Sequence, residues 1–477
     1  MNILVLNGSP KGDYSITLQT VNYLEALHPE HTFTTLHVGQ RIKALEKDFS
    51  PAIEAIEKAE LLLFAYPVYT FIVPCQLHRF IELMKEYKVQ VEGKFATQIS
   101  TSKHFYDVTA HRFIQDNCQD MGMKCIRGLS ADMDDLLTEK GQKEAESFWQ
   151  HLCWCVEKDY YEPFYNVGTM TASQTGSVEG SATCSDNVYA APYATVCNKP
   201  VSATIPSQPG TATEGDIVIV TDCTPENTRL SSMIARFQAV LPRKSRIVNI
   251  QEYPLRGGCL GCFNCATDGK CIYTDGFDSF LREKIQTAQA IIYAFTIRDH
   301  SMGSRFKMYD DRQFCNGHRT VTIGMPIGYL IDGNYSVETN LQMIIEGRAQ
   351  VGGNILAGIA TNESAPDKAI DQLAASLVYA LEHQNTQPQN FYGVGGMKIF
   401  RDLIFQMRGM MKADHRFYKA HGQYDFPQKN KGLILKMYLV GALISSPKIK
   451  AKMGNKMNEG MIAPYRKVLE QIRKSIS

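Results

Sequence analysis

The segment "NILVLNGSPKGDYSIT", residues 2–17, sets the expectation for the fold. Residues 2–6 are almost wholly apolar, as in a strand that is buried on both faces of a parallel sheet. A turn rich in Gly, Ser and Pro follows, and then a helix with apolar positions at Ile16, Val21 and Leu24. A strand, a tight turn and a helix in this order predict the first unit of an α/β domain.

The same alternation of strand and helix continues and then repeats. The first half has strand-like runs at Asn2–Leu6, Thr32–Val38, Glu60–Tyr66, Phe95–Ser100 and Cys125–Leu129. The second half has them at Gly215–Thr221, Ser245–Ile250, Ala288–Phe295, Arg319–Gly324 and Asn354–Ile359. "AELLLFAYPVY" from Ala59 also matches "AQAIIYAFTIR" from Ala288. We therefore expect two tandem copies of a doubly wound, parallel, five-stranded sheet with helices on both faces.

These patterns divide the chain into four parts. We expect one α/β domain over residues 1–165 and a second over residues 215–385. Residues 166–214 between them are rich in Thr, Ser, Gly and Pro, which is typical of a linker, although a lid is the alternative for so long a segment. Residues 386–477 form a basic helical extension.

Composition limits the class of protein. The chain has 477 residues, of which 44% are hydrophobic and 21% charged, as in globular proteins. The residues after Met1 lack the basic start and apolar core of a secretion signal. The apolar run Gly432–Ser446 contains Lys436 and is too short for a transmembrane span. We therefore expect a cytoplasmic protein, in whose reducing surroundings clustered cysteines bind metal or do redox chemistry.

The extension carries a charge of its own. Residues 391–477 contain 17 Lys and Arg against 5 Asp and Glu, whereas the remainder has 33 against 44. We interpret it as helices packed on the second domain with a solvated basic face. The alternatives are a docking face for an acidic electron-transfer partner and a helix that lies on a membrane surface. No motif favours nucleic-acid binding.

The turn "NGSPKGDYSIT" is a candidate phosphate site. It lies where doubly wound sheets bind ligands, at the carboxyl end of a strand and the N-terminus of a helix. Ser9, Ser15 and Thr17 add hydroxyl groups and Lys11 adds a positive charge. The pattern matches neither the dinucleotide fingerprint nor the P-loop. The alternative is an ordinary capped helix start.

Two more loops belong to the same edge of the sheet. The loop Ala65–Pro74, "AYPVYTFIVP", is aromatic where a polar turn is usual, which a flat aromatic ligand would explain. The alternative is that these aromatic side chains pack into the domain's own core. The loop "STSKHFYDVT" follows the fourth strand, and its Lys103 or His104 would supply positive charge beside a reduced ring. The alternative for those two residues is simple solvation.

Four of the thirteen cysteines crowd into "CLGCFNCATDGKC". They are Cys259, Cys262, Cys265 and Cys271, spaced C-x2-C-x2-C-x5-C within an insertion after the second strand of the second copy. Structural zinc usually joins two separated knuckles, whereas one tight loop with x2 spacing is typical of a [4Fe–4S] cluster. Zinc and metal-free thiols remain the alternatives.

These features together resemble the flavodoxin-like NAD(P)H-dependent FMN reductases, and the cysteine loop is similar to that of the iron–sulfur flavoproteins. The resemblance rests on "ILVLNGSPK", "YPVY", "FKMYDDR" at Phe306–Arg312 and the cysteine spacing. It implies two flavodoxin-like sheets with strand order 2-1-3-4-5. It also implies FMN, with its phosphate on Ser9, Lys11, Ser15 and Thr17, its ring edged by Pro67, Val68, Tyr69 and Thr70, and its far side closed by Thr101, Ser102, Lys103 and His104.

The second copy departs from this pattern. Its first loop, "TDCTPENTRL", places Asp222 and Glu226 where a phosphate would bind. We therefore expect one flavin, in the first copy, and an iron–sulfur cluster at Cys259, Cys262, Cys265 and Cys271 that serves it, so that one chain mimics a dimer.

The resemblance implies an FMN-dependent NAD(P)H oxidoreductase that takes hydride from a nicotinamide nucleotide and passes electrons on. The alternative functions are a non-enzymatic electron carrier or docking flavoprotein with metal-free cysteines. The sequence leaves open the electron acceptor, the choice between NADH and NADPH, and the oligomeric state.

Overall fold

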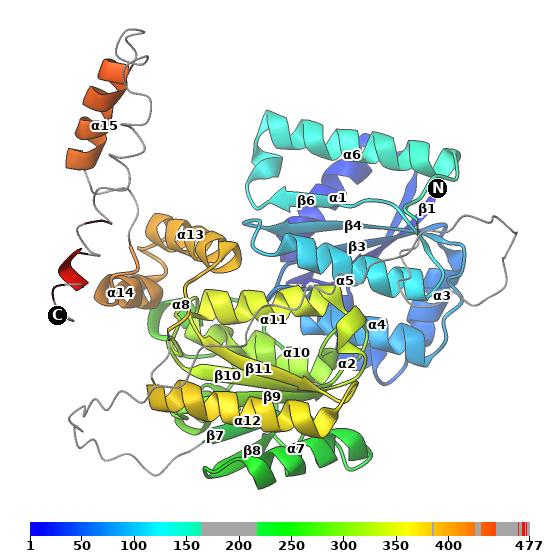
Figure 1. Cartoon of the computed structure of the whole chain (residues 1–477). Helices are drawn as coiled ribbons and strands as arrows, with labels where there is room; N and C mark the ends of the chain where they lie inside the picture. The colour runs from blue at the N-terminus through cyan, green and yellow to red at the C-terminus, as the bar shows by residue number, and fades with distance from the viewer. Residues whose placement is uncertain are drawn as a thin grey trace, which may run out of the picture. The chain divides into compact units, whose positions relative to one another are not determined.

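The computed structural model describes residues 1–163, 217–383, 386–424 and 431–444, with the single positions 466, 470–472 and 474. The predicted linker, residues 166–214, lies outside the described residues. The chain divides into two compact units, Met1–Asp414 and His415–Ser477, and the first unit contains both sheets (Figure 1).

The first sheet is parallel, with strand order β2-β1-β3-β4-β5. Its strands are β1 (Asn2–Asn7), β2 (Thr32–Leu36), β3 (Leu61–Pro67), β4 (Phe95–Ser102), β5 (Lys124–Cys125) and β6 (Leu129–Asp132). Its helices are α1 (Ile16–Leu27), α2 (Val38–Leu45), α3 (Ser50–Lys58), α4 (Cys75–Glu86), α5 (Asp107–Asp120) and α6 (Glu139–Glu157). The predicted order is confirmed, with β1 and β3 side by side at the point where the chain reverses direction across the sheet.

Alternation along β1 fixes the two faces of this sheet. Ile3 and Val5 pack with α1 and α6, whereas Leu4 and Leu6 pack on the opposite face with α2 to α5. Because β1 and β3 are apolar on both faces, they are buried between two layers of helices. The helix α2 was not among the segments that the sequence pattern predicted.

The second sheet repeats the topology. Its order, β11-β10-β9-β7-β8, is the same 2-1-3-4-5 arrangement read from the other edge (Figure 1). Its strands are β7 (Ile217–Thr221), β8 (Ser245–Asn249), β9 (Ala290–Thr296), β10 (Pro326–Asp332) and β11 (Ile355–Thr361). Its helices are α7 (Thr228–Val240), α8 (Cys265–Asp268), α9 (Phe277–Phe280), α10 (Gly303–Arg312), α11 (Thr339–Gly352) and α12 (Pro366–His383).

Two strand predictions were wrong. The fourth strand of the second sheet is Pro326–Asp332, whereas the predicted Arg319–Gly324 forms turns. The β-branched residues of that segment imitate a strand, but Val321 and Ile323 are exposed, while the whole of β10 is buried. The fifth strand of the first sheet, predicted as Cys125–Leu129, is split into β5 and β6, so this sheet has six strands and not five.

The two copies pack through equivalent helices, α4 and α10, and the contacts are reciprocal. The backbone N–H of Cys75, at the start of α4, donates to Asp311 Oδ2 of α10 at 2.8 Å. In the other direction, the N–H of Ser304, at the start of α10, donates to Glu82 Oε1 of α4 at 2.7 Å. The sequence match places Cys75 opposite Ser304 and Glu82 opposite Asp311. The two copies therefore meet across a local pseudo-twofold axis.

The loops that precede these helices repeat the same geometry. Tyr69 and Ile72 form an antiparallel bridge in the first copy, and Arg298 and Ser301 form its counterpart in the second. Each bridge encloses two residues with positive φ, Thr70 and Phe71 (43° and 76°) and Asp299 and His300 (51° and 60°). Backbone with positive φ, which costs non-glycine residues free energy, thus occurs at the same positions in both copies.

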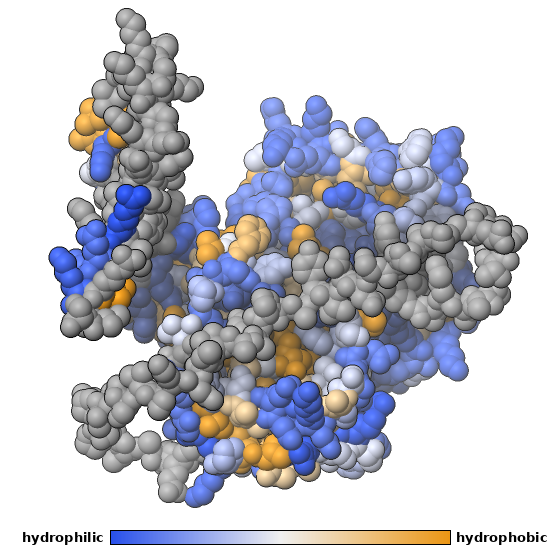
Figure 2. Space-filling view, viewed as in Figure 1, coloured by the Kyte–Doolittle hydropathy of each residue, from blue (hydrophilic) through white to orange (hydrophobic). Residues whose placement is uncertain are grey.

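The remaining described helices are α13 (Phe391–Gln406), α14 (Lys412–Ala420) and α15 (Lys431–Ile444). In the second unit, α15 exposes large apolar side chains, including Leu435, Tyr438 and Leu439 (Figure 2). None of the described helices combines the length and apolarity that a membrane crossing requires. The proposed roles of the basic extension stay predictions.

The buried ion pair between α10 residues Lys307 and Asp311 tests the interface. Both side chains are fully buried. Asp311→Ala should lower the free energy of unfolding by about 3–5 kcal/mol, because it leaves the ammonium of Lys307 buried without its carboxylate. Urea unfolding measures this loss. In the exposed pair Lys140–Glu144, Glu144→Gln is the control and should cost about 0.5 kcal/mol or less. Equal losses in the two variants would contradict the account.

Candidate functional site

The turn between β1 and α1 brings hydrogen-bond donors and one lysine together. Ser15 is the N-cap of α1, and its Oγ accepts a hydrogen bond from the N–H of Leu18 at 3.4 Å. Ser9 is buried, and its Oγ accepts from the N–H of Lys11 at 3.3 Å. The first N–H groups of a helix have no acceptor within the helix, and the helix dipole makes this end positive. Hydroxyl groups, N–H groups and one ammonium therefore meet at this turn.

The end of β4 joins the same site through a buried hydroxyl pair. Thr17 Oγ1 on α1 lies 2.6 Å from Thr101 Oγ1. Next to it, Lys103 Nζ donates to Asp132 Oδ1 at 2.6 Å and to Asp134 Oδ2 at 2.7 Å. Burial lowers the pKa of Lys103, but these hydrogen bonds outweigh it and the net pKa shift is upward. The ammonium stays charged, and two carboxylates largely neutralise it.

The loop after β3 is held from the second copy. Thr70 Oγ1 donates to Asp311 Oδ1 at 2.8 Å, and Lys307 Nζ donates to the carbonyl of Tyr69 at 2.8 Å. Burial, followed by the charges of Cys259 and Asp311, raises the pKa of Tyr69 well above its ordinary value, so its hydroxyl stays neutral. The loop that was predicted to edge a flat ligand is thus fixed by the domain interface.

The cysteine loop of the second copy covers this site in the first. The Nζ of Lys11 lies 5.3 Å from the ring centroid of Phe263, and Gln76 Nε2 donates to the carbonyl of Cys259 at 3.3 Å. The backbone of the cysteine loop lies so close to the first copy that two of its positions require glycine. A Cβ atom at Gly258 would overlap Cys75 Sγ, and one at Gly261, where φ is 60°, would overlap Tyr69 Oη.

The buried side chain of Arg312 anchors the base of the loop. It donates to the carbonyl of Gly257 at 2.9 Å and to Asp275 Oδ1 at 2.7 Å, and its guanidinium lies 4.4 Å from the ring centroid of Tyr273. Burial opposes ionisation of Asp275, but Arg312 outweighs it and lowers the pKa of Asp275 to about 2. Arg312 ends the "FKMYDDR" segment, so that segment serves to position the cysteine loop.

The four loop cysteines differ in exposure. Cys262 is exposed, whereas burial raises the pKa of Cys259 to about 12 and that of Cys265 to about 11. Tetrahedral zinc with bonds of about 2.3 Å holds its sulfur ligands about 3.8 Å apart. Among the described residues, no three of these Sγ atoms lie within 4.8 Å of one another, so no closed zinc cage is preformed. A cubane, in which each cysteine binds a different iron, spreads its ligands more widely.

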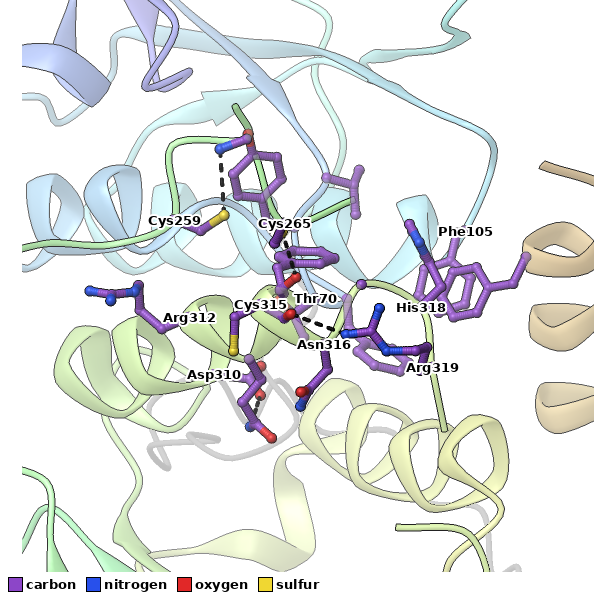
Figure 3. Close-up of a pocket in the computed structure, with 18 of the residues that line it drawn as sticks. Thr70, Phe105, Cys259, Cys265, Asp310, Arg312, Cys315, Asn316, His318 and Arg319 are labelled. Carbon is purple, nitrogen blue, oxygen red and sulfur yellow. Dashed lines mark hydrogen bonds between the residues drawn. The ribbon is translucent and has the colours of Figure 1, made fainter. Parts of the chain in front are cut away.

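A fifth cysteine, Cys315, lies beside this group (Figure 3). It follows α10 in a short 3-10 turn (Gln313–Asn316) and is buried, and burial raises its pKa to about 12. The Sγ of Cys265 donates to the carbonyl of the adjacent Phe314 at 3.1 Å. The sequence spacing of Cys315 did not indicate this position, because tertiary packing brings it next to a loop that is distant in the sequence.

One cavity of about 440 Å³ connects these parts (Figure 3). The predicted residues that line it are Ser9, Lys11, Ser15, Thr17, Pro67, Val68, Tyr69, Thr70, Thr101, Ser102, Lys103, Cys259, Cys262, Cys265 and Cys271. His104 is the predicted residue that does not line it, because its ring faces Asp107 Oδ2 at 2.9 Å instead. Three strand ends of one copy and an insertion of the other thus form a single chamber.

Sequence reasoning missed an aromatic wall of the same cavity. His318 stands 4.7 Å from Phe400 of α13, and Phe400 stacks on Phe105 at 4.3 Å, all between ring centroids. Phe314 continues the wall to Tyr69 at 5.7 Å. These residues come from separate elements of both copies and from α13, so no periodic pattern marked them in the sequence.

The equivalent turn of the second copy has a different character. Asp222 is buried, which raises its pKa to about 6. Asn227 Nδ2 donates to Thr296 Oγ1 at 3.2 Å, and Thr296 in turn donates to Asp332 Oδ2 at 3.2 Å. Carboxyl groups therefore lie at this edge of the second sheet, Asp222 on the turn and Asp332 at the end of β10, and the second acidic residue that the sequence singled out, Glu226, is exposed on the turn.

Comparison with known proteins supports the fold. Residues 1–113 match a family model described as "Flavodoxin-like fold". The first domain therefore has a flavodoxin-like fold, and the second repeats its topology. A comparison with curated proteins found no match.

Several solved structures are similar to about a third of the chain. They include general stress protein 14 in complex with FMN from Treponema denticola (13% identity, 32% of this chain and 98% of that one, TM-score 0.27). They also include an FMN-dependent NADH-azoreductase from Bacillus anthracis in complex with FMN (14%, 32% and 98%, TM-score 0.26). A third is FerB, a flavoenzyme NAD(P)H:(acceptor) oxidoreductase from Paracoccus denitrificans (18%, 34% and 99%, TM-score 0.28). We draw no functional conclusion from these low scores.

Thiol reactivity tests the geometry of the cysteine loop. In chelator-treated protein near pH 8, iodoacetamide should modify Cys262 at least about tenfold faster than Cys259, Cys265 or Cys315. Cys262 is exposed, whereas the raised pKa of each other thiol keeps it protonated and unreactive. Peptide mass spectrometry over time measures the rates. Equal rates for Cys259 and Cys262 would contradict the arrangement.

Proposed function

We propose that the first domain binds FMN in this cavity and that the protein is an NAD(P)H-dependent flavin oxidoreductase. The observation that carries the proposal is the convergence of three loops, at the carboxyl ends of β1, β3 and β4, on one cavity where the strand order reverses. That position is the usual ligand site of doubly wound sheets.

The residues present fit such a cofactor. Ser9, Ser15 and Thr17 supply hydroxyl groups and Lys11 a positive charge at the α1 end, which suits a phosphate monoester. Elsewhere the lining is mostly apolar and aromatic, which suits a flat ring, and a volume of about 440 Å³ lies within the range of cofactor sites. We propose that Pro67, Val68, Tyr69 and Thr70 edge the ring and that Thr101, Ser102 and Lys103 close its far side.

Bound FMN would supply hydride acceptance and one-electron transfer. The chain itself would bind, orient and exclude water. The Thr17–Thr101 pair fixes α1 against β4, and the second copy fixes the loop after β3 through Thr70 and Tyr69. The neutral hydroxyl of Tyr69 and the paired ammonium of Lys103 place little net charge beside the ring. His104 lies outside this set.

We further propose that Cys259, Cys262, Cys265 and Cys271 hold an iron–sulfur cluster that exchanges electrons with this flavin. The support is that the loop faces the same cavity as the phosphate turn, with Phe263 against Lys11. Metal-free thiols remain the alternative, and in that case the protein is a plain flavoprotein. The acidic groups at the corresponding edge of the second sheet, Asp222 on the turn after β7 and Asp332 at the end of β10, favour one flavin per chain.

Steady oxidation of NADH or NADPH by the purified protein distinguishes an oxidoreductase from a non-enzymatic electron carrier. Anaerobically purified protein should carry FMN and oxidise NADH or NADPH steadily in the presence of a small acceptor. Reduction only by another protein would favour a non-enzymatic electron carrier. A preparation that binds no FMN after reconstitution would overturn the proposed function.

The charge of Lys11 gives a sharp test of the phosphate position. Lys11→Met should weaken FMN binding about tenfold or more, since a charged hydrogen bond contributes about 1.5–3 kcal/mol, and should leave riboflavin binding unchanged. Titration monitored by flavin fluorescence measures both affinities. Lys47→Met removes an exposed lysine of the same domain and is the control. If wild-type protein bound riboflavin as tightly as FMN, the phosphate assignment would fail.

The cysteines are tested separately from the flavin. Replacing Cys259, Cys262, Cys265 and Cys271 with serine should abolish bound iron and sulfide, measured chemically after anaerobic purification, because hydroxyl groups do not replace soft thiolates. FMN content should remain, because the phosphate turn belongs to the first copy. Wild-type protein without iron would contradict the cluster and leave the flavin proposal standing.

A further inference from the structure

We propose that His78, Glu82 and Asp299 form a divalent metal site that ties the two copies together. His78 and Glu82 lie on α4 of the first copy, and Asp299 lies on the loop before α10 of the second. One ligand atom from each lies within 4.8 Å of the others. The site is separate from the cysteine loop and depends on neither the flavin nor an iron–sulfur cluster.

The imidazole of His78 is the first observation that points to an ion. The side chain is completely buried, and neither ring nitrogen has a hydrogen-bond partner within the described structure. The nearest carboxylate oxygen, Glu82 Oε1, lies 3.9 Å from Nε2, too far for a hydrogen bond. A buried ring with two unused nitrogens is costly without a partner.

The pseudo-twofold axis supplies the second observation. In the sequence match His78 corresponds to Lys307, Glu82 to Asp311 and Asp299 to Thr70. At the Lys307 position, the ammonium binds Asp311 and the carbonyl of Tyr69, and Thr70 donates to Asp311. At the His78 position, an imidazole stands in place of the ammonium, and the carboxylate of Asp299 stands in place of the hydroxyl of Thr70. A metal ion at the His78 position would supply the positive charge that the ammonium of Lys307 supplies at the equivalent position of the second copy.

The surrounding ionic network has a deficit of cations. Arg79 and Lys85 pair with Glu82 and Asp299, but both also serve other carboxylates. The ring nitrogens of His300 lie 2.9 Å from Asp120 Oδ2 and 3.0 Å from Glu338 Oε2, so His300 is counted as a third cation. Against these three stand six connected carboxylates, Glu46, Glu82, Glu86, Asp120, Asp299 and Glu338.

The donor set indicates which metals fit. One imidazole and two carboxylates suit Zn²⁺, Mn²⁺ or Fe²⁺, with water in the open positions. The hydrogen bonds that hold Glu82, from the N–H of Ser304 at 2.7 Å and from its Oγ, and the ion pair of Lys85 with Asp299 at 2.9 Å would orient the ligands from outside. The ion would join α4 to the loop before α10 and so brace the domain interface.

Mn²⁺ is the probe of choice, since oxygen and nitrogen donors bind it and thiolates favour other metals. Titration of the full chain, with free Mn²⁺ counted by its EPR signal, should show one bound ion per chain that Zn²⁺ displaces. Mn²⁺ should also raise the temperature of unfolding. The variant with serine at the four loop cysteines should bind Mn²⁺ like wild type, which separates this site from the loop.

Two matched variants decide the assignment. Asp299→Asn keeps the shape and tolerates positive φ, and His78→Lys recreates the Lys307 arrangement. Each should weaken Mn²⁺ binding at least about a hundredfold and remove the thermal shift, and His78→Lys should keep the metal-free stability. Wild-type protein that binds no Mn²⁺ or Zn²⁺, as expected if His78 is simply protonated, would overturn the proposal. So would variants that bind as wild type does.

Discussion

The structure of the first unit depends on two reciprocal hydrogen bonds at helix N-termini. Glu82 accepts from the start of α10 and Asp311 from the start of α4, each at less than 3 Å and each buried. A carboxylate at the positive end of a helix satisfies N–H groups that otherwise lack partners. Because each copy caps the other, neither helix is completed without its partner, and the relative placement of the two sheets is fixed.

That placement explains why the cysteine loop matters to the first copy. The insertion leaves the second sheet after β8, and the Arg312–Asp275 pair directs it toward α4. Gly258 and Gly261 then allow its backbone to lie against Cys75 and Tyr69. The copy with the hydroxyl-rich turn thus receives the cysteines, while the copy that donates them keeps an acidic turn. The two copies therefore form one composite cavity with different contributions from each.

The fold was largely predictable because its signals are local. Buried parallel strands are continuous apolar runs, and residues 2–6 and 217–221 show this plainly. The prediction failed at Arg319–Gly324, where β-branched residues lie in exposed turns and Pro326 opens the true strand. Proline is tolerated at the first position of a strand, so Pro326 is compatible with the start of β10.

The candidate site was predictable only in part. The turn between β1 and α1 and the cysteine loop are each one continuous segment of the sequence, and both line the cavity. Cys315, His318 and Phe400 come to it through tertiary packing, and no spacing reveals such residues. Nothing in the sequence indicated the two reciprocal hydrogen bonds, from Cys75 to Asp311 and from Ser304 to Glu82. Their donors are backbone N–H groups, which every residue type except proline carries.

The claim that both copies build one redox chamber is tested most directly by a crystal structure of anaerobically purified, FMN-loaded protein, with anomalous data at the iron edge. The account predicts flavin density against the turn of β1 in the first copy. It also predicts an iron peak at Cys259, Cys262, Cys265 and Cys271 facing the same cavity. Flavin at the Thr221–Thr228 turn of the second copy, or iron on a surface turned away from the flavin, would contradict it.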